Sequence, residues 1–176
     1  PVAGLIDGYL VYRSFMTAPG ARRLPLFPSI YAGHVQFYGK AYYGNDTNAF
    51  YAMTGEALTN GEHLGYIWPN KILMSEPRKL FFKRLALTRQ CLLPFMNDGE
   101  MERPLNFREM PQLFSHWGDF ATNGPLQSPA IAHSVWKRPE GIAIVAVNLT
   151  DQERSTEVDF DGARRGLTDE NLTLWK

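Results

Sequence analysis

The sequence predicts an α/β segment followed by an all-β segment, and three observations support this order. From Pro25 onward, apolar runs typical of strands alternate with segments of helical periodicity, which indicates a parallel α/β layer. After about Asp98, prolines, glycines and asparagines divide the chain into short pieces. Two strong strand patterns then flank a turn at residues 138–141. We therefore divide the chain into residues 1–98 and 99–176.

Two strands are expected in the first segment. The apolar run Leu26–Tyr31 predicts a strand, because Pro25 and Pro28 stand near its start, where a strand tolerates proline. Residues 60–68, with the sequence NGEHLGYIW, predict a turn and a short buried strand that Pro69 ends.

Two helices follow these strands. Residues 45–58 have capping residues at their start and apolar residues at helical spacing. The second helix is expected to begin after Ser75, because Glu-Pro in the first turn suits a helix start. Pro94 should end or kink this helix, and Gly99 lies where a C-terminal cap is expected.

The second segment predicts an antiparallel sheet, part of a β-sandwich. Proline and glycine in the turn Arg138-Pro139-Glu140-Gly141 match a type I turn between two strands. Residues 142–147 are apolar on both faces, which predicts a central strand. Residues 155–160 predict a third strand and residues 172–175 a fourth.

Composition excludes several classes of partner. The 18 basic and 18 acidic residues balance with no block of like charge, so neither nucleic acid nor an anionic membrane is expected as the main partner. No apolar run is long enough to span a membrane, and we expect a soluble protein of undetermined compartment. The histidines and the single cysteine, Cys91, lack metal-site spacing, and no phosphate-binding loop is present. We therefore expect neither a metal nor a cofactor.

Neither predicted segment is complete. Two βα units cannot close an eight-stranded barrel, and the second segment is shorter than a sandwich of roughly 100 residues. We expect the chain to be a fragment of a larger protein.

The order of motifs resembles the C-terminal part of bacterial glycoside-hydrolase-like proteins, which have a (β/α)8 barrel followed by a β-sandwich. The motifs are IDGYL, PLFPSIYAGHVQFYG, NGEHLGYIW, FMNDGEM and SVWKRPEGIAIVAVN. The resemblance implies that Leu26–Tyr31 is the seventh barrel strand and residues 60–68 the eighth, and that the partner of this segment is the remainder of its own barrel. Relatives often have Tyr-His-Asp-Tyr after the seventh strand, whereas this chain has Tyr31-Ala32-Gly33-His34 and lacks the acid.

A carbohydrate-binding site is the expectation that follows from this resemblance. In a barrel of this type the active site lies on the loops after the C-terminal strand ends. Aromatic rings stack on sugar C–H surfaces and neutral polar groups bind hydroxyls. The residues expected to contact a sugar are Asp7, Tyr31, His34, Tyr38, Trp68 and Asn70.

No catalytic pair can be assigned. Glycoside cleavage needs two carboxyl groups, ~5 to 5.5 Å apart for retention and ~6.5 to 9.5 Å apart for inversion. Asp46 and Glu56 are explained by a helix, Glu62 by the start of a strand, and Asp7 by a local turn. The resemblance implies that the catalytic acids lie on strands outside this segment.

Three functions are consistent with the sequence. The first is the C-terminal portion of a carbohydrate-active enzyme, a glycoside hydrolase, that contributes substrate-binding loops. The second is a non-catalytic carbohydrate-binding or scaffolding module. The third is a polysaccharide lyase or transferase on the same fold.

Overall fold

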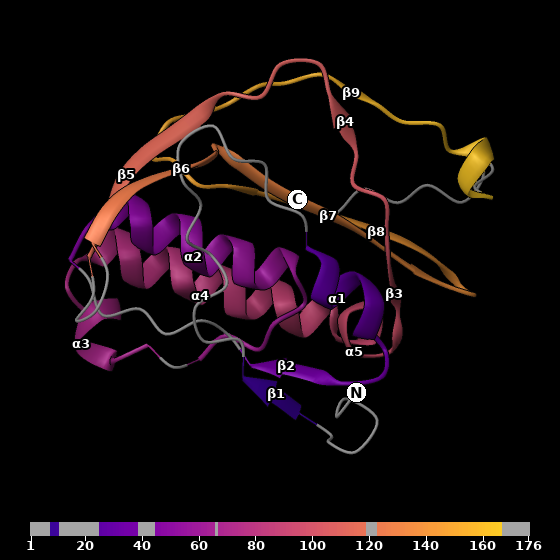
Figure 1. The fold of residues 1–176 in the computed structure, drawn as a ribbon, viewed down its shortest axis with the longest axis horizontal. Helices are drawn as coiled ribbons and strands as arrows, with labels where there is room; N and C mark the ends of the chain where they lie inside the picture. The colour runs from indigo at the N-terminus through magenta and orange to yellow at the C-terminus, as the bar shows by residue number, and fades with distance from the viewer. Residues whose placement is uncertain (1–7, 11–24, 39–44, 66, 119–122, 167–176) are drawn as a thin grey trace.

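The computed structural model describes residues 8–10, 25–38, 45–65, 67–118 and 123–166. Helices and small, mostly antiparallel sheets form an α+β fold (Figure 1). The helices are α1 (Leu26–Tyr31), α2 (Thr47–Thr59), α3 (Pro69–Ile72), α4 (Glu76–Cys91), α5 (Leu93–Asp98) and a 3-10 turn (Ala163–Arg165). The strands are β1 (Gly8–Leu10), β2 (Gln36–Tyr38), β3 (Glu100–Glu102), β4 (Asn106–Phe107), β5 (Gln112–Gly118), β6 (Asn123–Pro129), β7 (Ile131–Arg138), β8 (Gly141–Asn148) and β9 (Val158–Asp159).

The prediction of a (β/α)8 barrel followed by a β-sandwich is wrong. Parallel pairing between named strands is limited to β1 and β2, and the remaining named strands of the described residues pair antiparallel. The expected seventh barrel strand is a helix, so it cannot be a parallel neighbour of the segment that holds Leu64. The division of the chain at residue 98 stays a prediction.

The two prolines at the start of Leu26–Tyr31 are compatible with the helix found there. Pro25 precedes α1 as its N-cap, and Pro28 lies in its first turn. Backbone N–H groups of the first turn have no partner within a helix, so proline removes nothing there. The same two residues that suit the start of a strand therefore suit the start of a helix equally well.

A short parallel layer lies at the amino-terminal end of the chain. Strand β2 pairs with β1 in parallel, with Gly8 opposite Gln36 and Leu10 opposite Tyr38. After α2, the chain comes back beside β2, where an isolated parallel bridge joins Tyr38 to His63. The strand expected at residues 60–68 is thus reduced to single-residue bridges at His63 and Ile67, with α3 beginning at Pro69.

Both long helices of the sequence analysis are confirmed. The Asp46 side chain caps α2 by accepting a hydrogen bond from the Ala49 backbone N–H at 2.7 Å. Ser75 caps α4, and its side chain accepts from the backbone N–H of Arg78. Helix α4 ends at Cys91, before Pro94, which lies in the first turn of α5.

Helix α4 buries two arginines on the face that contacts α2. Arg78 donates to the backbone oxygens of Asn45 and Lys71 and to the Thr47 hydroxyl, and its guanidinium lies over the Phe50 ring at 5.1 Å. Arg89 donates to the Asn97 side-chain oxygen and to a methionine sulfur. Neutral acceptors therefore compensate most of the cost of these buried cations, although the buried Nε of Arg89 has no hydrogen-bond partner among the described residues.

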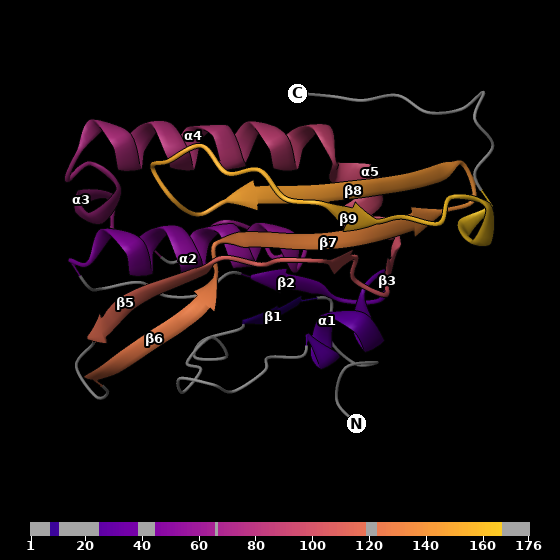
Figure 2. The same ribbon diagram turned by 90° about the horizontal axis from the view of Figure 1, so that it is seen from above.

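The antiparallel hairpin expected around residues 138–141 is confirmed. Strands β7 and β8 pair from Ile131 opposite Asn148 to Arg138 opposite Gly141. Among the described residues, the strand of residues 142–147 is not central as predicted, because β7 lies between β3 and β8 (Figure 2). The strand expected at residues 155–160 shortens to β9, which pairs with β4, and residues 172–175 lie outside the described residues.

The core lies where α2 packs against β7 and β8 on one side and α4 on the other (Figure 1). Most side chains of α2 are buried, as expected for a helix covered on several sides. Gly55 permits close packing, because a Cβ atom there would lie 2.2 Å from a Leu149 methyl carbon. The Trp136 side chain of β7 is fully buried, and its Nε1 donates to the Ser134 hydroxyl at 2.9 Å.

Candidate functional site

The outer face of the parallel layer carries the best-defined group of polar and aromatic side chains. Side chains alternate along a strand, so Gln36 and Tyr38 share one face of β2 while Phe37, which is buried, faces the core. Residues directly opposite one another in a sheet share a face, which adds His63 to this group. We call Gln36, Tyr38 and His63 the β2 face cluster.

The Tyr38 ring packs against both neighbours of β2. It stacks on the His63 imidazole, with ring centroids 5.3 Å apart and an interplanar angle of 23°. It also extends over Gly8 of the neighbouring strand, where a Cβ atom would lie only 2.6 Å from its Cε2. Glycine in the IDGYL motif therefore makes room for the ring. Tyr38 remains 47% exposed and can contact a ligand.

A short hydrogen bond orients His63. Its Nε2 lies 2.6 Å from the Gln36 side-chain oxygen. An amide oxygen can only accept, so Nε2 carries the proton and Nδ1 holds the lone pair of the neutral ring. Burial lowers the pKa of His63, and the positive charge of Arg89 lowers it further. The imidazole is therefore held neutral near pH 7, and its Nδ1 is a hydrogen-bond acceptor.

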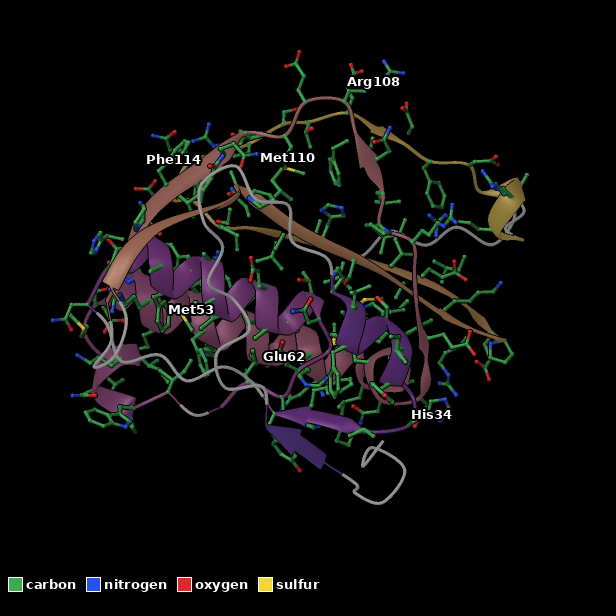
Figure 3. All side chains as sticks on the ribbon, viewed as in Figure 1. His34, Met53, Glu62, Arg108, Met110 and Phe114 are labelled. Atoms are coloured by element: carbon green, nitrogen blue, oxygen red, sulfur yellow. The ribbon has the colours of Figure 1, made fainter. Side chains whose placement is uncertain are left out.

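The cluster contains no carboxylate. The acid nearest in sequence is Glu62, which is buried beside His63 and accepts a hydrogen bond from the Asn60 side chain at 3.2 Å (Figure 3). Asp7 lies outside the described residues. The cluster can thus stack on a flat apolar surface and exchange hydrogen bonds, but its own members do not supply an acid and a nucleophile for hydrolysis.

The structure separates Tyr31 and His34 from this cluster. Tyr31 lies on α1, half-buried, with its ring 4.8 Å from that of Phe27. His34 is exposed in the turn before β2 (Figure 3), whereas Tyr38 is the last residue of β2. The expectation that Tyr31 and His34 contact a sugar at the end of a barrel strand depended on a strand at Leu26–Tyr31, and this segment is a helix.

Trp68 and Asn70 lie at the start of α3. Both are exposed, Trp68 as the N-cap residue and Asn70 within the helix. Figures 1 and 2 both place α3 at the far end of the α2–α4 pair, away from β2. Of the six residues predicted to bind sugar, one belongs to the β2 face cluster, and it is Tyr38.

His63 was not predicted as a site residue, because the spacing of the histidines bears only on metal binding. Its position after the helix that follows β2 could have indicated that it lies beside Tyr38. When a helix connects two parallel strands, the neighbouring strands run side by side, so residues on them can meet on one face. Tyr38 and His63 stand on either side of α2 and meet in this way.

Within the described residues, no three His, Cys, Asp or Glu side chains come close enough to hold a metal ion. Over the same residues, no helix has the length and apolarity needed to cross a bilayer. No protein-family model, curated protein or solved structure matches the chain. The fold and the cluster together define an α+β protein with an aromatic and polar surface site on a short parallel layer.

Proposed function

We propose that the chain binds carbohydrate through the β2 face cluster, as the substrate-binding portion of a carbohydrate-active enzyme. The observation that carries the proposal is the half-exposed Tyr38 ring, which His63 supports by stacking and Gly8 by its lack of a side chain. A ring held in this way loses little freedom when a ligand covers it.

The hydrogen-bonding groups beside the ring suit sugar hydroxyls. A hydroxyl group both donates and accepts, and the neutral His63 offers an acceptor at Nδ1. The Gln36 amide nitrogen adds two donors while its oxygen is engaged by the imidazole. A neutral surface of this kind favours uncharged sugars over anionic ones.

Binding without cleavage is a second candidate, and one observation favours it. The three members of the cluster include no carboxyl group. We expect the 176-residue chain to show no turnover of aryl glycosides. Turnover that disappears in Asp7→Asn would instead identify Asp7 as a catalytic acid and would contradict this expectation.

The test is affinity electrophoresis and glycan-array binding of the full chain, with neutral gluco-, xylo-, manno- and galacto-oligosaccharides as probes. Tyr38→Ala should weaken binding to the preferred sugar by roughly tenfold or more, by analogy with the cost of removing one stacking aromatic. Tyr38→Phe should retain most of the affinity, because it keeps the ring. Gln36→Ala should weaken binding to a smaller extent, because it releases the imidazole.

Phe114 provides a matched control. It is an exposed aromatic residue on β5, well away from β2 (Figure 3). Phe114→Ala should bind sugar as the wild-type chain does. The proposal is refuted if no neutral sugar binds, or if Tyr38→Ala and Phe114→Ala have equal effects on a sugar that does.

A further inference from the structure

Strand β8 has a strand partner on one side only among the described residues, because the sheet order is β3-β7-β8. Its eight residues, GIAIVAVN, include no charged residue and no proline. Natural edge strands are usually protected from pairing by charge, by proline or by shortness. β8 has none of these protections, so its outer edge is suited to accept another strand.

One face of β8 is open as well. Trp136 stands on the face of β7 that packs toward Gly61, so its neighbour Val135 stands on the opposite face. Val135 is fully buried, whereas Ile144, directly opposite it on β8, is 46% exposed. The difference arises because residues before and within β4 cover β7: the Phe107 ring lies 4.4 Å from that of His133.

We propose that β8 pairs antiparallel with β8 of a second copy of this chain, with the two-fold axis at Ile144. A two-fold axis perpendicular to a sheet places residues of one face opposite residues of the same face. Centred on Ile144, it sets that residue against its own copy, Ile142 against Ala146, and Ala143 against Val145.

This alignment favours a second copy as the occupant. Every opposed pair within residues 142–146 is apolar, and each includes a β-branched residue, which favours pairing across strands. Like charges are not brought together anywhere in this stretch. The contact is also isologous, so it closes as a dimer and does not propagate into a fibre. The surface is distinct from the β2 face cluster, and the proposal does not depend on carbohydrate binding.

The test is sedimentation velocity of the full chain, from dilute solution up to about 100 µM, a range that reports weak to moderate association. The wild-type chain should pass from monomer to dimer. Ile144→Lys and Ile144→Glu should each remain monomeric, because the same charge would face itself across the axis. An equimolar mixture of the two variants should restore the dimer, because the facing charges are then opposite.

Ile30→Lys is the matched control, because Ile30 is an exposed isoleucine on α1, 62% accessible. It should dimerise as the wild-type chain does. Circular dichroism melts establish that each variant is folded. Hydrogen exchange of the wild-type chain provides a measurement without any substitution: amides of residues 141–148 should exchange more slowly as the concentration rises.

Four results would overturn the proposal. A wild-type chain that stays monomeric, with exchange independent of concentration, excludes the dimer. Dimers that survive Ile144→Lys exclude β8 as the interface. Monomeric single variants whose mixture also stays monomeric exclude the axis at Ile144. Assemblies that keep growing beyond a dimer exclude a closed two-fold contact.

Discussion

Replacing the buried Gly61 with alanine should destabilise the protein strongly. Gly61 follows α2 with φ at +72°, a backbone conformation that disfavours residues with a Cβ atom. The added methyl group would also lie 2.5 Å from Cη2 and 2.8 Å from Cζ2 of the fully buried Trp136 ring. Two independent costs therefore act at one position.

The magnitude follows from these two terms. The left-handed backbone costs a non-glycine residue roughly 1–2 kcal/mol. Ordinary carbon–carbon contact is ~3.5–4.0 Å, so the ring must move by about 1 Å within a packed core. Overpacking of this kind costs about 1–3 kcal/mol, and the reduced entropy of the unfolded chain offsets about 0.4–1 kcal/mol. We expect a net loss of about 2–4 kcal/mol.

Urea unfolding followed by circular dichroism measures this loss. With a slope of about 2 kcal/mol per molar urea, the midpoint should fall by about 1–2 M. Gly65→Ala is the control, because no atom lies within 4 Å of its Cβ position, and it should change stability by less than about 0.5 kcal/mol.

A double-mutant cycle separates the two terms. The indole atoms in closest contact are absent from phenylalanine, so in a Trp136→Phe background Gly61→Ala should cost only the backbone term of roughly 1–2 kcal/mol. Equal midpoints for Gly61→Ala and Gly65→Ala would refute this account of the position. An unchanged cost in the Trp136→Phe background would refute the steric term alone.

Three further predictions concern the cap of α2, the histidines and Gly8. Asp46→Ala should lower the free energy of unfolding by about 1 kcal/mol in urea titrations, whereas Asp46→Asn, which retains the cap, should cost little; equal losses would argue against capping. Burial lowers the pKa of both His63 and His133, so the unfolded chain binds protons that the folded chain does not. The free energy of unfolding should therefore be constant above about pH 7.5 and fall as the pH drops through about 6.5, by at most about 1.4 kcal/mol per pH unit for each histidine. In His133→Gln, the urea midpoint should depend less on pH than it does in the wild-type chain. Gly8→Ala should displace the Tyr38 ring from His63 and weaken sugar binding with little change in the melting temperature, and unchanged binding would show that the ring position does not matter.

Local sequence determined those elements whose signals agree over a short stretch. Helices α2 and α4 have side-chain caps at Asp46 and Ser75, and α4 ends before Pro94, so their ends depend on contacts within a few residues. The β7–β8 hairpin is equally local, because its turn and its two strands are contiguous. The ends of these elements depend on residues close in sequence, so reasoning from neighbouring residues was sufficient to predict them.

Only the tertiary structure decided the elements whose local signals are ambiguous. Prolines near the start of Leu26–Tyr31 suit a strand and a helix alike, and the choice of helix α1 removes the barrel. The apolar residues of β8 suggested a central strand, but the coverage of a strand depends on which distant segments lie beside it. The β2 face cluster joins residues 27 positions apart, since Gln36 and His63 meet only after α2 has returned the chain. Pairing between distant segments depends on the packing of the whole chain, and the pattern of a single strand does not contain it.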